Sequence, residues 1–464
     1  MVFSGFTFLL LFLPLSVLCT LPFRKTAYKN AVLCLFSLIF YAWGEPVYVL
    51  LMLLSILLNY AAGLAMERKP ALKKPVLVLM LVLNLGTIFW FKYADFLLEN
   101  INSLYSVSLP LTRLALPIGI SFYTFQILSY VIDVYRGKHP AQKSLLSLAT
   151  YISMFPQLVA GPIVRYGTVE KELRERTVTL HGFADGLSRC AFGLAKKVLL
   201  ANQMALAADC VFNDANLLPG MVYWIGAICY TLQIYFDFSG YSDMAIGMGQ
   251  MFGFSFPENF LYPYTASSVT DFWRRWHISL SSWFREYVYI PLGGNRRGVP
   301  RQILNMCVVW LLTGLWHGAS WNFVIWGAYY GLLLILEKHV LERVLKRLPA
   351  FVRHILTLLL VVVGWVIFRV EDAPRIGSVL GSMFSFSSAG TGSFLVSSSN
   401  ALSPLLLVIP AVLCCLPWKE YCTGRFGEKN WFRPVRYLLA FALWVLSIFM
   451  LLGESYNPFI YFRF

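Results

Sequence analysis

Long apolar runs recur along almost the whole chain, with short polar or basic gaps between them. The runs lie near residues 4–22, 31–43 with 47–66, 75–91, 111–132, 145–163, 186–212, 221–252, 303–337, 353–370, 402–417 and 433–452. A helix that crosses a bilayer core takes about 20 mostly apolar residues. The pattern therefore predicts an all-α polytopic membrane protein with about eleven transmembrane helices.

Two intervals depart from this pattern. Residues 253–302 are too polar to span a membrane and too aromatic for an ordinary solvated loop. Such a segment is expected to lie at the interface or to re-enter the protein beside a cavity. Residues 381–403 are rich in Ser and Gly and are predicted to form an exposed loop.

The sequence predicts one membrane domain over residues 1–464, because no soluble domain interrupts it. Its expected parts are the N-terminal helices (1–252), the interfacial or re-entrant segment (253–302), a helical region (303–337) and the C-terminal helices (338–464).

Composition supports a membrane protein and argues against a nucleic-acid-binding one. Hydrophobic residues make up 58% and charged residues 13% of the 464 residues, whereas soluble domains carry roughly 25% charge. The net charge of +15 gathers in gaps between apolar runs, at 24–29, 67–74 and 338–347. Short cytoplasmic loops and anionic headgroups favour such clusters. The lipid bilayer is therefore an expected partner and nucleic acid is not.

The same basic gaps predict the orientation of the chain. Two crossings separate the gaps at 24–29 and 67–74, and the turn between those crossings, Gly44-Glu45-Pro46, has no Lys or Arg. Placing both gaps in the cytoplasm puts the N-terminus outside. The nine cysteines form no CxxC pair, so neither a metal site nor a disulfide framework is expected.

His317 lies inside an uncharged run from Gln302 to Leu336, beside Gly314 and Gly318, where the helix is expected to bend or break. Counted from Asn305, His317 is about 18 Å along a helix, near the middle of a bilayer core of about 30 Å. A histidine at that depth is costly unless it faces a cavity or a partner. Position alone is equally consistent with a structural hydrogen bond between helices.

A buried neutral imidazole accepts a proton and can activate a substrate hydroxyl towards a thioester carbonyl. Asn322 and the indoles of Trp316 and Trp321 could hydrogen-bond that imidazole or a developing oxyanion. The sequence does not choose among these donors.

Further polar residues are candidates for binding. His277 follows Arg274, Arg275 and Trp276, which suggests an anion or phosphate site or an interfacial belt of aromatic and arginine residues.

Two other polar features lie within apolar runs. Asp237 could hold a cation or orient a basic partner, or could serve only to join helices. Tyr123 and Gln126 belong to one polar stripe at helical spacing, which is expected to face a bundle interior; whether it lines a tunnel is left open.

At this point the motifs resemble the membrane-bound O-acyltransferase family, in its bacterial alginate O-acetylase branch. The stretches that carry the resemblance are PIGISFYTFQILSYVIDVYRG (117–137), MFPQLVAGPIVRY (154–166), YFDFSGYSDMAIGMG (235–249), DFWRRWHISLSSWFREYVYIPLGGNRRG (271–298), LTGLWHGASWNFVIWGAYYG (312–331) and the ending NPFIYFRF. The resemblance implies a bowl of helices with a central tunnel. It assigns the family's catalytic histidine to His317 and its second polar position to His277.

The resemblance also implies substrates and partners. An acetyl group would pass from a cytoplasmic thioester, acetyl-CoA or another acyl donor, across a bacterial cell membrane. It would reach a hydroxyl of an exported polysaccharide or a separate exported esterase-like partner, with no tightly bound cofactor. Alternatives are D-alanyl or other acyl transfer from a carrier-protein thioester to a cell-wall polymer, a glycan flippase or transporter, and a scaffold for an exported enzyme.

Overall fold

The computed structural model describes residues 1–159, 161–385 and 390–453. Within these residues every regular element is a helix, which confirms the predicted all-α class. The ending NPFIYFRF lies outside the described residues. The chain divides into two compact units, Met1–Ala191 with Tyr241–Pro257 and Phe192–Gly240 with Glu258–Phe464. That they form one membrane domain stays a prediction.

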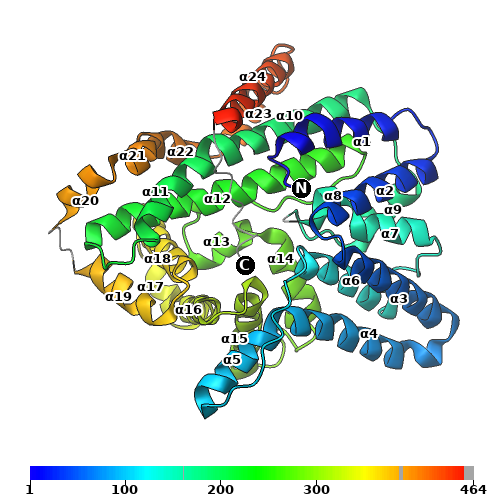
Figure 1. Ribbon diagram of the computed structural model, residues 1–464, viewed down its shortest axis with the longest axis horizontal. Coiled ribbons are helices and arrows are strands. Elements are labelled where there is room, and N and C mark those ends of the chain that lie inside the picture. The colour runs from blue at the N-terminus through cyan, green and yellow to red at the C-terminus, as the bar shows by residue number, and fades with distance from the viewer. Residues whose placement is uncertain (160, 386–389, 454–464) are drawn as a thin grey trace. The chain divides into compact units, whose positions relative to one another are not determined.

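The first unit contains the N-terminal helices (Figure 1). They are η1 (Thr7–Phe12), α1 (Leu13–Thr20), α2 (Thr26–Gly44), α3 (Tyr48–Arg68), η2 (Pro70–Leu72), α4 (Lys73–Ile88), η3 (Phe89–Tyr93), α5 (Ala94–Tyr105), α6 (Ile120–Tyr135), α7 (Leu145–Ser153), α8 (Phe155–Leu158), α9 (Tyr166–Arg174) and most of α10 (Leu180–Ala195). The last part of α12 (Gly220–Met251) also belongs to this unit.

The second unit contains the remaining helices. They are η4 (Lys196–Ala201), α11 (Asn202–Phe212), the first part of α12, η5 (Pro263–Thr265), α13 (Val269–Arg275), α14 (Ile278–Phe284), η6 (Arg285–Tyr289), α15 (Val299–His317), α16 (Trp321–Leu336), η7 (Glu337–Leu341), α17 (Glu342–Leu345), α18 (Ala350–Arg369), α19 (Ala373–Phe384), α20 (Thr391–Ser397), α21 (Ser399–Leu402), η8 (Ser403–Leu407), α22 (Val408–Cys414), α23 (Trp418–Phe426) and α24 (Phe432–Gly453).

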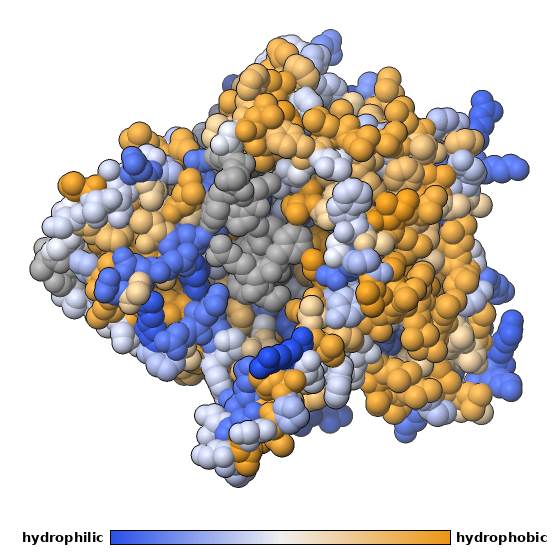
Figure 2. Space-filling view, in the orientation of Figure 1, coloured by the Kyte–Doolittle hydropathy of each residue, from blue (hydrophilic) through white to orange (hydrophobic). Residues whose placement is uncertain are grey.

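Several helices have the length and apolarity of membrane spans. Among the described residues these are Tyr48–Arg68, Pro70–Tyr105, Trp321–Leu345, Ala350–Arg369 and Phe432–Gly453, and the number rises to six if the bent pair Thr391–Ser397 and Ser399–Cys414 is one span. Leu50 and Val82 expose 64% and 63% of their surface, and Figure 2 shows apolar side chains covering α3 and α4. The chain is a polytopic membrane protein.

The count of spans differs from the sequence estimate of about eleven. Two of the expected runs are interrupted by proline. The run expected at 111–132 becomes helical only at Ile120, after Pro117 and after Gly119 in a left-handed conformation (φ 75°). The run at 145–163 breaks between α7 and α8, next to Pro156. Proline restricts the residue before it and removes a helix donor.

The prediction of a loop at 381–403 is wrong for most of the described residues in this range. Helix α19 continues to Phe384, and α20 and α21 form short helices beyond it. Residues 386–389 lie outside the description. The Ser- and Gly-rich composition lowers helix propensity but does not prevent helical turns.

The predicted break beside His317 is confirmed, because α15 ends at His317 and α16 begins at Trp321. The two helices lie side by side (Figure 1). A Cβ atom at Gly327 would lie 2.5 Å from the carbonyl oxygen of Trp310, so only glycine permits this approach. Helix α15 starts at Val299 rather than near Asn305, and the depth of His317 in the bilayer stays a prediction.

Aromatic rings join α13 to the neighbouring helices. The ring of Trp273 lies 4.7 Å from that of Trp310 and 4.8 Å from that of Tyr330. The ring of Trp276 lies 4.7 Å from that of Trp365. Aromatic pairs at such distances contribute about 0.5–1.5 kcal/mol each beyond their buried area. This cluster fixes the segment that carries His277 against α15, α16 and α18.

Candidate active site

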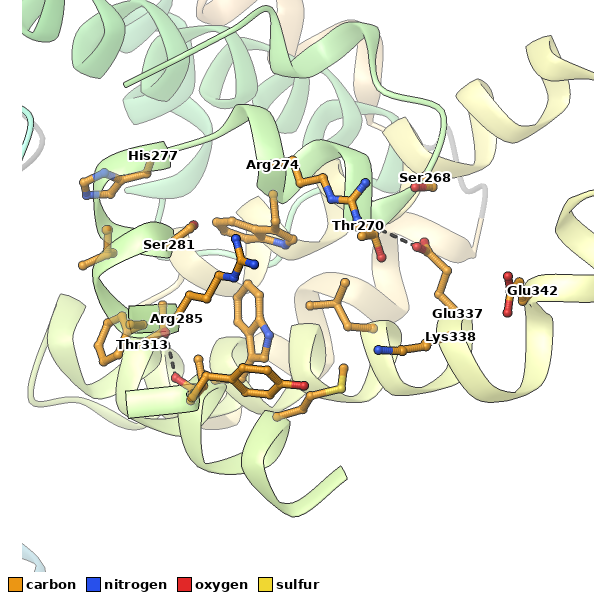
Figure 3. Close-up of a pocket in the computed structure, with 18 of the residues that line it drawn as sticks. Ser268, Thr270, Arg274, His277, Ser281, Arg285, Thr313, Glu337, Lys338 and Glu342 are labelled. Atoms are coloured by element: carbon orange, nitrogen blue, oxygen red, sulfur yellow. Dashed lines mark hydrogen bonds between the residues drawn. The ribbon is translucent and has the colours of Figure 1, made fainter. Parts of the chain in front are cut away.

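One cavity of about 750 Å³ in the second unit brings the two histidine motifs together. Its wall includes His277, from the junction of α13 and α14, and His317, from the end of α15. Figure 3 shows His277, Ser281 and Arg285 on one side of the cavity and Lys338, Glu337 and Glu342 on the other. The sequence motifs around residues 277 and 317 therefore build a single site.

His277 occupies a constrained position at the start of α14. Its backbone is left-handed (φ 44°), a conformation that few non-glycine residues adopt and that often marks functional sites. Its Nδ1 lies 3.1 Å from Oδ1 of Asn259. Its Nε2 is buried and makes no hydrogen bond to any of the described residues. The imidazole is thus held at one nitrogen and leaves the other for a ligand.

Burial also sets the charge of His277. Only 1% of its surface is exposed, and the loss of hydration lowers the pKa of its imidazole to about 3. Desolvation disfavours the charged form of a histidine. His277 is therefore neutral at physiological pH.

His317 is enclosed by aromatic rings. Its imidazole lies 5.1 Å from the ring of Trp326 and 5.2 Å from that of Phe368, both nearly edge-to-face. The ring of Trp316 lies 5.0 Å from the imidazole of His317 and 5.7 Å from that of His277. Only 6% of His317 is exposed. A water-poor site of this kind strengthens electrostatic interactions with a bound substrate.

Positive charge lines the rest of the cavity. The cationic lining residues are Arg274, Arg285, Lys338, Lys346 and Arg353. The carboxylates that face the cavity, Glu337 and Glu342, already have partners. Glu337 accepts hydrogen bonds from the backbone N–H groups of Val269 and Thr270, at 2.7 and 3.1 Å, and Glu342 pairs with Lys346 at 2.6 Å. The cavity therefore favours an anionic ligand.

The structure separates the two adjacent arginines of the sequence motif. Arg274 lines the cavity. The Nε of Arg275 instead lies 2.9 Å from Oδ1 of Asp271, and its Nη1 lies 3.1 Å from Oγ1 of Thr265. Trp276 is buried in the aromatic cluster and is not among the lining residues. Arg275 and Trp276 thus support the site rather than face it.

Other predicted site residues also lie apart from the cavity lining. The Nδ2 of Asn322 donates to the carbonyl oxygen of Phe368 at 2.9 Å. Trp321 starts α16 and is 51% exposed. Asp237 pairs with Lys197 at 2.7 Å, both side chains being almost fully buried. The contacts of Asn322 and Asp237 are those of residues that hold helices together.

Tyr123 and Gln126 lie on α6, in the first unit, and both are buried. Both polar atoms of the Gln126 side chain have no hydrogen-bond partner among the described residues. A polar stripe that faces the interior is confirmed within this unit, and its role in a tunnel stays a prediction. No three His, Cys, Asp or Glu residues gather as metal ligands in the described parts of the chain; a metal-free site stays an expectation.

Sequence reasoning missed several residues of the site. Lys338 and Lys346 were considered only as part of a basic gap, and they also line the cavity. Arg285 follows α14, the helix that begins after His277, and no feature of the sequence marked it as a site residue. Asn259 lies outside the quoted motifs, and only the fold brings it to His277.

An all-helical membrane protein with two buried histidines in one cationic cavity has the features of a membrane-embedded transferase. The profile of the membrane-bound O-acyltransferase family matches residues 35–370, and the chain belongs to that family. It is an acyltransferase.

Named relatives refine the comparison. The chain is 41% identical over 490 residues to the "Probable alginate O-acetylase" of Pseudomonas putida, covering 100% of both chains. It is 31% identical over 518 residues to the peptidoglycan O-acetyltransferase of Helicobacter pylori, covering 100% of this chain and 98% of the relative. It is 29% identical over 233 residues to the teichoic acid D-alanyltransferase of Bacillus subtilis, covering 47% of this chain and 58% of the relative.

Proposed function

We propose that the protein transfers an acetyl group from a cytoplasmic thioester to a hydroxyl group of an exported polysaccharide, or to an exported partner enzyme that completes the transfer. The observation that carries this proposal is the single cavity that holds both His277 and His317 within a cationic wall. The full-length similarity to the alginate and peptidoglycan enzymes favours an O-acetyl group and a carbohydrate acceptor.

His317 is the proposed base. In the proposed step its imidazole takes the proton of the acceptor hydroxyl while the oxygen attacks the thioester carbonyl carbon. The C–O bond forms, the C–S bond breaks, and the departing thiolate receives that proton as a thiol. General base catalysis of this kind contributes about 10²–10⁴-fold. His277 assists from the same cavity wall.

The cationic wall is the proposed binding site of the donor. Acetyl-CoA and a carrier-protein phosphopantetheine both bear phosphate groups, and guanidinium groups bind phosphate through paired hydrogen bonds. Arg274 and Arg285 are placed for this role, with Lys338 on the opposite side (Figure 3). No tightly bound cofactor is needed for this chemistry.

The proposed location is a bacterial cell membrane with the N-terminus outside. The basic segments at 24–29, 67–74 and 338–347 would then face the cytoplasm. The thioester would enter from that side, and the acceptor from the other.

Sealed proteoliposomes test the proposal. Acetyl-CoA with a labelled acetyl group, or the same group on a carrier protein, is supplied on the side of the basic loops. Oligosaccharides of alginate, peptidoglycan and teichoic acid are supplied on the other side. We expect thioester cleavage with label on one acceptor. Preference for the carrier thioester would identify the alternative donor, and a D-alanyl thioester used in place of acetyl would identify the alternative acyl group. Absence of thioester cleavage with every donor would contradict the proposal.

A further inference from the structure

The buried side chain of Asn259 binds His277 in a way that determines which imidazole nitrogen carries hydrogen. Oδ1 of Asn259 accepts the backbone N–H of Ser279 at 3.3 Å and the Ser279 hydroxyl at 2.9 Å. A backbone N–H can only donate, so the amide atom that faces it is the carbonyl oxygen. That oxygen also lies 3.1 Å from Nδ1 of His277. An amide oxygen only accepts, so Nδ1 must donate.

Backbone hydrogen bonds hold the segment of Asn259 beside the segment of His277. Its carbonyl oxygen accepts the N–H of Ile278 at 3.0 Å, and the N–H of Leu261 donates to the carbonyl oxygen of Arg275 at 2.9 Å. These two bonds lie on either side of His277 in sequence. Asn259 itself is fully buried. The segment that carries the amide is therefore fixed to the same turn that carries the imidazole.

The competing arrangement is weaker. The Ser279 hydroxyl lies 3.5 Å from Nδ1 of His277 and could in principle donate to it. Nδ1 would then direct its lone pair at the lone pairs of the Asn259 oxygen at 3.1 Å. The shorter contact of the hydroxyl is the one to Asn259, at 2.9 Å. The hydrogen bonds are satisfied together only when hydrogen is on Nδ1.

We propose that Asn259 is a positioning residue that keeps His277 in the Nδ1–H tautomer, so that Nε2 presents a lone pair to the ligand in the cavity. His277 then accepts a hydrogen bond from a donor group of the bound ligand and does not donate to an oxyanion, while the proton of the acceptor hydroxyl goes to His317. This inference rests on the proposed function for its substrate. The tautomer itself is independent of it.

Apart from Asn259 and the Ser279 hydroxyl, aromatic rings surround the imidazole of His277. Rings from three elements pack on the imidazole: Phe238 of α12 at 4.6 Å, Trp316 of α15 at 5.7 Å, and Phe260 of the loop before η5 at 6.5 Å. The ionisable side chains that share its cavity are Arg274, Arg285, Tyr289, His317, Glu337, Lys338, Glu342, Lys346 and Arg353. Burial keeps the imidazole neutral, with its pKa lowered to about 3, so one nitrogen is left without hydrogen.

Nitrogen NMR of the full-length protein in lipid nanodiscs tests the tautomer directly. Histidine is labelled with ¹⁵N, and the spectrum of His277→Gln identifies the signals of His277 by difference. We expect hydrogen on Nδ1 and a bare Nε2 at pH 7 without substrate. Hydrogen on Nε2, or on both nitrogens, would overturn the inference. If His277 has the Nδ1–H tautomer but the protein cleaves no thioester, the result would contradict the proposed function and leave the inference about the tautomer standing.

Three variants separate positioning from folding. Asn259→Leu removes the acceptor and should abolish the pure Nδ1–H signal. It should also lower kcat by at least about tenfold with little change in KM. For comparison, the residue that orients the imidazole of a Ser-His-Asp triad contributes about 10⁴-fold to kcat. Asn259→Asp keeps an acceptor oxygen at this position. Unlike Asn259→Leu, it should keep the Nδ1–H tautomer and most of the wild-type kcat. Ser279→Ala, the matched control, should leave the tautomer unchanged. An Nδ1–H signal that survives Asn259→Leu, or that is lost in Ser279→Ala, would contradict the role of Asn259.

Discussion

His277 and His317 line one cavity, and the ring of Trp316 packs on both imidazoles, at 5.7 and 5.0 Å. The two histidines come from different elements, the α13–α14 junction and the end of α15. The indole links them, so a change at either element is expected to affect both. A site built in this way requires that α13, α14 and α15 keep their mutual positions.

The protonation state of His277 gives the first prediction. Burial lowers the pKa of its imidazole to about 3, whereas an unperturbed histidine has a pKa of about 6.5. Because the folded-state pKa is depressed, protonation of His277 opposes folding as the pH falls below about 6.5. We expect the NMR signal of His277 to stay that of a neutral ring from pH 8 to pH 5. A titration midpoint near 6.5 would contradict the buried site.

The cationic wall gives the second prediction. Arg274→Gln and Arg285→Gln each remove a guanidinium from the cavity and should raise the KM for acetyl-CoA about tenfold or more with little change in kcat, because hydrogen bonds to charged groups contribute about 1.5–3 kcal/mol. Arg275→Gln is the matched control, since Arg275 bonds Asp271 and Thr265 instead. Steady-state kinetics with varied donor measure the effect. An equal rise in KM for all three variants would show that the loss of charge acts non-specifically.

The buried ion pair of Lys197 and Asp237 gives the third prediction. Removing one partner of a buried ion pair takes the opposite charge away from the other partner, which costs about 3–5 kcal/mol. Lys197→Met and Asp237→Leu should each lower the thermal midpoint strongly, and the double variant should recover much of the loss. Thermal unfolding in detergent measures this. A double variant that is less stable than either single variant would contradict the explanation by a buried charge that has lost its opposite charge.

Sequence patterns predicted much of the fold because a helix that crosses the lipid core must be a long run of apolar residues. Apolar runs identified the helical class, and Gly318 marked the break between α15 and α16. Proline-containing runs such as 145–163 were predicted as single spans, because hydropathy averages over a break that local backbone geometry creates. The short helices α20 and α21 were missed, since their Ser- and Gly-rich residues carry no periodic apolar pattern.

The candidate site was predicted in part. The two histidines carried strong local motifs, and the cavity joins them. Arg274 and Arg275 were indistinguishable in sequence, because adjacent residues of a short helix point in different directions and only packing shows which faces the cavity. Asn259 and Lys338 could not be found, because their relation to His277 and the cavity depends on contacts between distant segments.

The central claim is that acyl transfer takes place in this cavity at the two histidines. Its most direct measurement is the rate of labelled acetyl transfer by the protein in proteoliposomes, compared among wild type, His317→Ala and His354→Ala. His354 is a half-buried histidine of α18 whose Nδ1 bonds the carbonyl oxygen of Ala266, and it is not among the cavity-lining residues. We predict that His317→Ala lowers kcat by about 10²–10⁴-fold at unchanged folding, while His354→Ala keeps a rate close to that of the wild type. Transfer that persists at the wild-type rate in His317→Ala would contradict the account.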